Sequence, residues 1–323
     1  MKILRAIDQL ESLDGPTHLA IGVFDGLQIG HQAVIGRALE SAVQVGGSAV
    51  VVTFDPHPVR VLRPEKAPRL LTSTRHKLQL IEKMGVNAVL LLEFTLEFSR
   101  TTPEAFVRQL AESSNHLSRV CVGQEWTFGA NRSGSTDLLK ELAPKFHFEV
   151  VTVPPVLVGE RVVSSTLIRS AVECRDFGSA TKYLGRPFTI LGTVSEGRQL
   201  GRRLGFPTAN LRAHNELFPP NGVYAAKARF RENDYGGVIN IGIRPTVENE
   251  SGERLLEIHL FDFDEQIYGQ DVEVEFLEYL RPEQKFAGLE ELKAQILRDA
   301  TKARAIYEAS RRISRSGLIR ELN

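Results

Sequence analysis

The chain has 323 residues, of which 42% are hydrophobic and 25% are charged, a composition typical of a folded globular protein and too hydrophobic for a disordered one. Its 40 Lys and Arg residues balance its 40 Asp and Glu residues, which excludes a uniformly basic nucleic-acid-wrapping protein, and two cysteines are too few for a disulfide framework. No hydrophobic run approaches the roughly 20 residues that span a bilayer, and the segment MKILRAIDQL lacks the apolar stretch of a signal peptide. We therefore expect a cytoplasmic protein with no membrane segment and, at this length, two domains.

The first half of the chain alternates between strand and helix patterns. A buried strand over 18–24 leads into a helix over 30–45, and a β-branched strand follows over 48–54. A strand–helix–strand unit of about 35 residues predicts a parallel sheet. The alternation continues with helices near 74–84, 103–113 and 135–143 and strands at 87–92, 118–123 and 147–153. This order predicts a doubly wound α/β domain.

The pattern changes after about residue 186. Short, partly alternating segments follow at 187–195, 223–231, 236–243, 254–263 and 271–280. Turn residues separate these segments, which favours an antiparallel sheet or a small barrel. An amphipathic helix is predicted over 289–311, and 312–323 is predicted to be a loosely held tail. We place the domain boundary after Gly185, which gives domains 1–185 and 186–323.

Three glycines punctuate the turn that follows the first strand. Gly22, Gly26 and Gly30 lie between the carboxyl end of a parallel strand and a helix N-terminus, and His31 begins the helix. At such a junction free N–H groups and the helix dipole attract anions, so the turn predicts a nucleotide pocket. Neither a Walker A nor a G-x-G-x-x-G pattern is present, so the residues alone leave open a tight turn with a capping or core histidine.

A second candidate site opens the other half. The segment 197–205 is rich in glycine and arginine, which suits a triphosphate, a nucleic-acid contact or a solvated hairpin equally well. Thr208 and Asn210 offer hard oxygen donors two residues apart on an extended segment, where both side chains point the same way. Such a pair suits Mg²⁺ shared with phosphate oxygens, although a turn remains the simpler interpretation of Thr-x-Asn alone.

Four segments of the first half together carry a family resemblance. They are Gln28–His31, Thr53–Pro58, Val122–Gly129 and Ser164–Arg169. They resemble the (H/T)xGH and accompanying motifs of the adenylyltransferase domain of bacterial bifunctional riboflavin kinase/FAD synthetases. The resemblance implies a nucleotidyltransferase-like sheet on which the phosphate of FMN attacks the α-phosphorus of ATP, with Mg²⁺ present, to give FAD and pyrophosphate.

The resemblance also assigns roles to single residues. Its ATP-binding positions are Gly22, Phe24, Gly30, His31, Ser165, Thr166 and Arg169. Its flavin-binding positions are Phe128, Asn131 and Arg132. His31 and Arg169 would act as catalytic phosphate contacts, with Arg169 offering a charge-assisted fork. Without the family, a surface salt bridge explains Arg169 as well.

One position of this motif departs from the family. Gln28 stands where the family usually has histidine, so the motif is QxGH, and smaller departures occur at Val23 and Glu125. Glutamine carries no charge and no titratable proton. If the family's imidazole acts like an oxyanion donor, its loss costs about 2.7–4 kcal/mol of transition-state stabilisation. We expect adenylyl transfer to be retained but weak.

The second half resembles the riboflavin kinase domain of the same family. Matching segments occur in the family's order at Pro207–Asn210, Asn240–Thr246, Glu257–Leu260, Asp262–Phe263, Tyr268–Gly269 and Leu280–Phe286. The resemblance implies a six-stranded antiparallel barrel with a C-terminal helix that transfers the γ-phosphate of ATP to the 5′-hydroxyl of riboflavin. Its ATP-binding positions are Gly197, Gly201, Arg202, Gly205, Thr208 and Asn210. Thr208 and Asn210 would hold Mg²⁺ and Glu257 would be the catalytic base, although an isolated strand glutamate is more often solvated.

The resemblance extends from about residue 15 to about residue 310. The sequence therefore predicts consecutive reactions, riboflavin to FMN and FMN to FAD, with ATP and Mg²⁺ serving both. Its partners would be small-molecule substrates, with no nucleic acid or membrane, in a monomer or weak homo-oligomer. A monofunctional riboflavin kinase whose first domain only binds nucleotide or flavin is the main alternative, because of Gln28. A nucleotide- or flavin-sensing module without turnover is a third interpretation.

Overall fold

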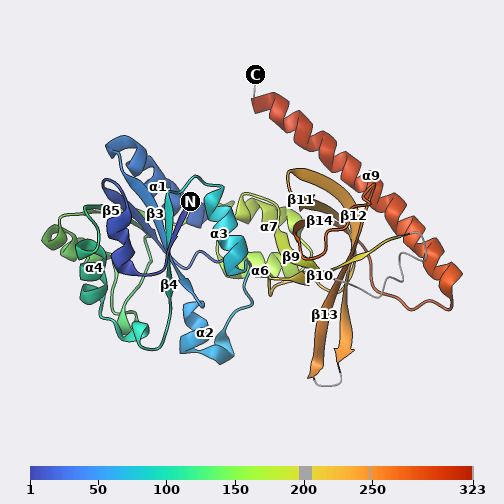
Figure 1. Ribbon diagram of the computed structural model, residues 1–323, viewed down its shortest axis with the longest axis horizontal. Coiled ribbons are helices and arrows are strands. Elements are labelled where there is room, and N and C mark those ends of the chain that lie inside the picture. The colour runs from blue at the N-terminus through green and yellow to red at the C-terminus, as the bar shows by residue number, and fades with distance from the viewer. Residues whose placement is uncertain (196–205, 247–248, 322–323) are drawn as a thin grey trace. The chain divides into compact units, whose positions relative to one another are not determined.

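The computed structural model describes residues 1–195, 206–246 and 249–321. The chain divides into two compact units, Met1–Ser165 and Thr166–Asn323 (Figure 1). The domain boundary expected from the sequence, after Gly185, lies closer to the C-terminus than the division between these two units and directly follows helix α7 (Phe177–Leu184). This boundary stays a prediction.

A six-stranded parallel sheet forms the centre of the first unit. Its strand order is β1-β4-β3-β2-β5-β6, and every neighbouring pair is parallel. The strands are β1 Lys2–Leu4, β2 Thr17–Ile21, β3 Ser48–Asp55, β4 Ala88–Glu93, β5 Leu117–Gly123 and β6 Glu149–Val153. Because β2 and β3 lie side by side in the middle of the sheet, the turns at their carboxyl ends meet at one edge.

Helices cover both faces of this sheet. Val51 of β3 packs with α1 (Ile29–Val45) and α3 (Thr74–Glu82) on one face. Val50 and Val52 pack with α4 (Pro103–Glu112) and α5 (Thr136–Leu142) on the other. The alternation follows from the two-residue period of a strand. Shorter elements are η1 Ile7–Ser12, α2 Pro58–Leu62, η2 Pro64–Lys66, η3 Phe98–Arg100, η4 Ala130–Arg132, η5 Ala143–Phe146, β7 Leu157–Val158 and β8 Arg161–Val162.

The second unit is a closed antiparallel barrel. Its order is β10-β13-β12-β11-β14-β9, and pairing of β9 with β10 closes the ring. The strands are β9 Thr189–Ser195, β10 Ala209–Ala213, β11 Gly222–Phe230, β12 Asn233–Thr246, β13 Asn249–Leu260 and β14 Asp271–Arg281. The helices α6 (Ser165–Glu173) and α7 precede the barrel, and α9 (Leu289–Glu321) follows it.

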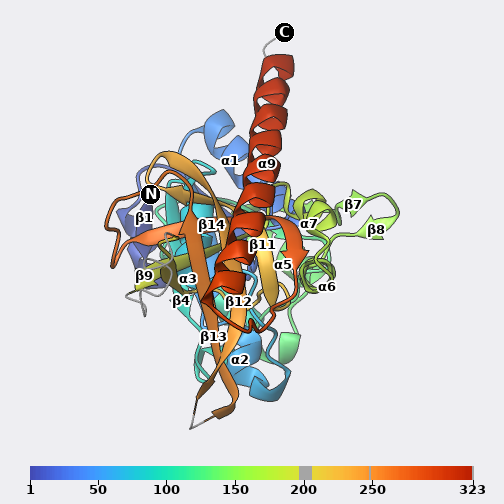
Figure 2. The ribbon, with the colours of Figure 1, turned by 90° about the vertical axis from the view of Figure 1, so that its right-hand side faces the viewer.

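Helix α9 packs against the outside of the barrel. It crosses β11, β12 and β14, as Figure 2 shows. Ala303 is fully buried in this contact and Tyr307 is 8% exposed. A Cβ at Gly236 would lie 2.4 Å from the Tyr307 ring, so only glycine lets the helix approach β12 so closely.

The predicted fold class is confirmed: a doubly wound parallel sheet is followed by a six-stranded antiparallel barrel with a C-terminal helix. The helix predicted to end at Arg311 instead continues as α9 to Glu321, so the predicted tail 312–323 is helical as far as Glu321. No proline occurs between residues 312 and 321, and Gly317, which costs about 1 kcal/mol relative to alanine, does not end the helix. The short strands β1 and β10 were not among the predicted ranges.

Candidate active sites

The turn after β2 that contains Gly22, Gly26 and Gly30, here called the glycine turn, has several residues with positive φ, a backbone conformation that only glycine adopts readily. Gly26 has a φ of +78°, and a Cβ there would lie 2.6 Å from Leu71 Cδ1. Phe24 and Leu27 also adopt positive φ, at 54° and 45°. The turn ends at Gln28, the N-cap of α1, which makes no side-chain capping hydrogen bond. The α1 N-terminus therefore adjoins the turn, as the sequence predicts for an anion site.

A buried carboxylate, that of Asp25, fixes the position of the glycine turn. Asp25 is 6% exposed, and its Oδ1 accepts hydrogen bonds from the backbone N–H groups of Leu71 at 3.0 Å and Thr72 at 3.2 Å. The N–H of Gly26 donates to Thr72 Oγ1 at 3.1 Å. The segment that leads into α3 thus holds the turn through three hydrogen bonds. Sequence reasoning missed Asp25 and Thr72, because 46 or 47 residues separate these partners.

Gln28 and His31 contact each other at the start of α1. The Gln28 Nε2 atom lies 3.3 Å from His31 Nε2, and the His31 ring packs edge-on against Phe24 at 5.4 Å. With the amide placed this way Gln28 donates, so His31 Nε2 accepts and Nδ1 carries the proton. Within the described ranges, His31 Nδ1 and Gln28 Oε1 are buried without a hydrogen-bond partner. Burial and, to a smaller extent, the charge of Lys77 lower the pKa of His31 to about 4, so the ring is neutral at pH 7.

Ser165 lies at the same turn. Its Oγ donates to the Asp25 carbonyl oxygen at 3.2 Å. The structure therefore brings together Gly22, Phe24, Gly30, His31 and Ser165 from the predicted ATP set. Thr166 and Arg169 follow in α6, within the second compact unit, and their part in this site stays a prediction.

The predicted flavin-side residues lie on one loop with two different environments. Phe128 is 7% exposed and stacks on Trp126 at 4.4 Å, so its ring is part of the packed core. Asn131 and Arg132 follow with left-handed φ values of 54° and 57°. The flavin-binding role of Phe128, Asn131 and Arg132 stays a prediction, and the structure adds a packing role for Phe128.

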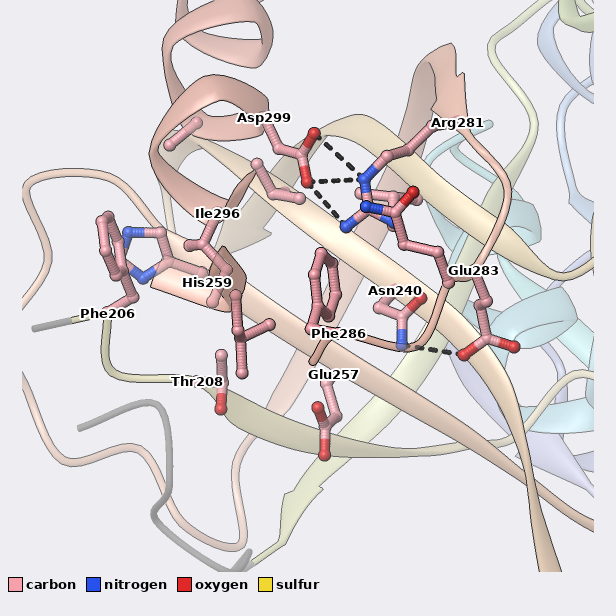
Figure 3. A pocket seen from close by; sticks show the side chains of 15 residues that line it. Phe206, Thr208, Asn240, Glu257, His259, Arg281, Glu283, Phe286, Ile296 and Asp299 are labelled. Carbon is pink, nitrogen blue, oxygen red and sulfur yellow. Dashed lines mark hydrogen bonds and ion pairs between the residues drawn. The ribbon is translucent and has the colours of Figure 1, made fainter. Parts of the chain in front are cut away.

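A cavity in the second unit lies between the outer face of the barrel and α9. Its volume is about 300 Å³. The barrel contributes polar residues from β12 and β13 together with Thr208, and α9 contributes Ile296 and Asp299 (Figure 3). Along β13, Leu256 and Ile258 face the barrel core, so Glu257 and His259 face the cavity.

Three polar residues form a row across neighbouring strands at this cavity. Glu257 of β13 pairs in register with Asn210 of β10 on one side and with Asn240 of β12 on the other. Directly paired residues of an antiparallel sheet point to the same face, so their side chains lie together. Thr208, two residues before Asn210, lines the same cavity as Glu257. The structure therefore joins the Thr/Asn pair and the predicted base, which are about 50 residues apart in sequence.

Further contacts hold the walls of the cavity. The Asn240 Nδ2 atom donates to Glu283 Oε1 at 3.2 Å, whereas Asn240 Oδ1 is buried with no partner in the described part of the chain. The Arg281 Nη2 atom lies 2.8 Å from Asp299 Oδ2 of α9. Figure 3 shows this ion pair on one side of the cavity, with Thr208 and Glu257 on the other. Sequence reasoning missed Asn240 as a single residue and Asp299 altogether.

The donor chemistry at this row fits a magnesium ion. Thr208 and Asn210 supply a hydroxyl and an amide oxygen, and the buried, unpartnered Oδ1 of Asn240 adds a third oxygen to the same face. Mg²⁺ prefers oxygen donors and keeps several waters or phosphate oxygens, so few protein ligands suffice. Gly197, Gly201, Arg202 and Gly205, the other predicted ATP contacts, lie outside the described residues.

Two features are absent from the described ranges. No helix there has the length and hydropathy that a membrane crossing requires. No three His, Cys, Asp or Glu side chains there gather closely enough to bind a metal ion.

Comparisons with known proteins match both halves of the chain. A family model for FAD synthetase matches residues 10–167, and one for riboflavin kinase matches residues 184–307. A bifunctional riboflavin kinase/FMN adenylyltransferase from Haemophilus influenzae is 34% identical over 310 residues, which cover 96% of this chain and all of that protein. Proteins of the same description from Escherichia coli K12 and Listeria monocytogenes are 35% and 37% identical, over 95% and 90% of this chain and 98% and 92% of theirs.

One solved structure shares the fold along most of its length. It is described as a macrolide-efflux protein from Streptococcus pneumoniae, with a TM-score of 0.79 and 28% identity, and the match covers 93% of this chain and 97% of that one.

Proposed function

Since the chain belongs to the family of bifunctional riboflavin kinase/FMN adenylyltransferases, we propose that it phosphorylates riboflavin to FMN in its barrel and adenylylates FMN to FAD on its parallel sheet. ATP is the co-substrate of both reactions. The kinase reaction belongs to domain 186–323 and the adenylyl transfer to domain 1–185. The observation that carries the proposal is the register that aligns Glu257 with Asn210 beside the cavity.

In the kinase reaction, the 5′-hydroxyl of riboflavin attacks the γ-phosphorus of ATP and ADP leaves. Glu257 accepts the hydroxyl proton, and its place on a central barrel strand fixes the carboxylate toward the cavity. Thr208 and Asn210 would hold Mg²⁺, which would neutralise negative charge on the phosphates. The remainder of the rate enhancement comes from alignment by the cavity walls.

In the adenylyl transfer, an FMN phosphate oxygen attacks the α-phosphorus of ATP and pyrophosphate leaves. This displacement needs no covalent enzyme intermediate, so the residues bind and orient the phosphates. A neutral His31 acts as a hydrogen-bond donor through Nδ1 rather than as a cation, and Ser165, Thr166 and Arg169 complete the phosphate contacts. The buried Nδ1 atom of His31 supports this role, because a phosphate oxygen that reached it would accept a hydrogen bond that the protein leaves unmade.

The matches to both domain models favour the bifunctional interpretation over a monofunctional kinase. We assign the enzyme to the cytoplasm, which is supported by two unpaired cysteines, one of them exposed. Its partners are small-molecule substrates rather than nucleic acid, in keeping with a net charge of zero, and it acts as a monomer or weak homo-oligomer.

Two separate assays test the proposal. With riboflavin and MgATP the protein is expected to release FMN and ADP, and with FMN and MgATP it is expected to release FAD and pyrophosphate. Chelation of Mg²⁺ should stop both. Absence of ADP release would reject the kinase assignment, and absence of FAD above background would reduce the first domain to a binding domain.

A further inference from the structure

A lysine is buried beneath the glycine turn of the first unit. Lys77 lies in the second turn of α3, whose N-terminus is capped by Ser73, and it is only 6% exposed. Burial of a lysine is unusual unless its ammonium group is fully hydrogen-bonded. The site described so far does not account for this residue.

The three donors of the Lys77 ammonium meet three acceptors. Nζ lies 3.0 Å from Thr53 Oγ1, 3.2 Å from the Val23 carbonyl oxygen and 3.4 Å from the Phe54 carbonyl oxygen. Thr53 is itself fully buried and donates from Oγ1 to the Val23 carbonyl oxygen at 2.9 Å. One side chain therefore connects the turn after β2 with the carboxyl end of β3. Because a trans peptide directs its N–H away from its C=O, fixing the Val23 carbonyl also fixes the direction of the Phe24 N–H.

Three titratable side chains on neighbouring elements interact electrostatically with this ammonium group. Asp25 approaches from the turn and Asp55 from the end of β3, and both favour the charged form. His31 approaches from α1, and its neutral form is favoured in part by the lysine charge. Burial outweighs the two carboxylates and lowers the pKa of Lys77 to about 8. At pH 7 the group is still mostly an ammonium with three donors, whereas a neutral amine has only two.

We propose that Lys77 is a positioning residue for adenylyl transfer, which holds the glycine turn against the end of β3 so that Gln28 and His31 keep the geometry that the phosphates require. This inference rests on the proposed FMN adenylyltransferase function. Lys77 acts through the turn and touches no substrate. Its positive charge must be present, because loss of the third donor frees one of the carbonyls that it holds.

The test compares Lys77→Met with Lys83→Met in the full-length chain. Lys83 is exposed at the end of the same helix, so its variant controls for the loss of a lysine from α3. We expect Lys77→Met to lower the kcat of FAD synthesis by about 10²-fold, the loss that a displacement of about 1 Å produces, with riboflavin phosphorylation unchanged in the same sample. Lys83→Met should leave both activities unchanged. An FAD synthesis rate in Lys77→Met within twofold of wild type would overturn the proposal.

A pH profile separates positioning by charge from a general packing role. FAD synthesis by the wild type should decline as the pH rises through about 8, because Lys77 loses its proton there. A Lys77→Arg variant stays charged, so its activity at pH 9 relative to pH 7 should exceed that of the wild type, whatever its absolute rate. An equal decline of FAD synthesis between pH 7 and pH 9 in the wild type and in Lys77→Arg would also refute the inference. This comparison of pH profiles is the deciding test if Lys77→Met does not fold. Absence of FAD synthesis in the wild type at every pH would instead reject the proposed function.

Discussion

At the residue scale, we expect the side chain at position 28 to set the rate of adenylyl transfer. Gln28 is buried at the N-cap of α1 and directs its amide nitrogen at His31. It therefore orients the histidine but offers a phosphate neither a charge nor a titratable proton. The family's usual histidine would place a second imidazole ring at the same point. Because this chain lacks that ring, we expect adenylyl transfer to be retained but weak.

Gln28→His should raise the rate of FAD synthesis from FMN. The increase in the kcat of FAD synthesis should not exceed about 10²–10³-fold, which is the effect of one hydrogen-bond donor to an oxyanion. Pyrophosphate release at saturating ATP and FMN measures it, and the rate of riboflavin phosphorylation in the same sample is the control. An unchanged rate of FAD synthesis would show that the departure from the family motif has no kinetic consequence.

Glu257 is the proposed proton acceptor of the kinase reaction. Glu257→Gln keeps the size of the side chain and its place in the strand but cannot accept the proton. Riboflavin and ATP should bind with nearly unchanged affinity, while ADP release should fall by about 10²–10⁴-fold, the usual contribution of a general base. Calorimetry for binding and a coupled ADP assay for turnover separate the two effects. Turnover near that of the wild type would remove Glu257 from the mechanism.

At the scale of elements, contacts from helices or from the segments next to them fix the turns and strands on which the candidate site residues lie. In the first unit, the segment that leads into α3 holds the glycine turn through Asp25 and Thr72. In the second unit, α9 anchors the end of β14 through the Arg281–Asp299 ion pair and closes one wall of the cavity. The Asp299 side chain is 8% exposed and also accepts from Gln295 Nε2 at 2.8 Å.

Asp299→Ala should destabilise the second unit by about 1–3 kcal/mol, because it leaves the partly buried Arg281 guanidinium without its carboxylate partner. The KM for riboflavin should rise as the segment after Arg281 loses its anchor. Denaturant unfolding measures the first effect, with Asp264→Ala as a surface control that changes the free energy of unfolding by less than about 0.5 kcal/mol. Equal unfolding curves for the two variants would contradict the anchoring role.

The elements that sequence analysis predicted are those with a strong local pattern. The run of residues 48–54 predicts a strand buried on both faces, and Val50 and Val51 indeed pack into different core clusters. The apolar spacing after Gly30 likewise predicts α1. The short strand β10 has too few residues for alternation to be visible, and its pairing with β13 is a long-range property.

The site was predictable only where a motif marks it. Thr208, Asn210 and Glu257 stand in recognisable segments, and the barrel register joins them. Lys77 and Asp299 stand in no such segment, since their importance comes from burial and from partners distant in the chain. An amphipathic helix pattern does not reveal that one of its charged residues is buried.

At the scale of the whole molecule, the two matched domains correspond to two consecutive reactions. Each has its own candidate phosphate site, and the residues assigned to the kinase reaction all fall in the second unit. The product of the barrel is the substrate of the sheet domain, so one chain given only riboflavin should deliver both cofactors.

The most direct measurement follows riboflavin, FMN and FAD by chromatography over time after riboflavin and MgATP are mixed with the wild-type protein. FMN should appear first and then fall as FAD accumulates. The Glu257→Gln protein should leave riboflavin largely unconverted yet still turn added FMN into FAD. FMN that accumulates without any FAD, or a Glu257→Gln protein that loses both reactions while remaining folded, would contradict two separate active sites.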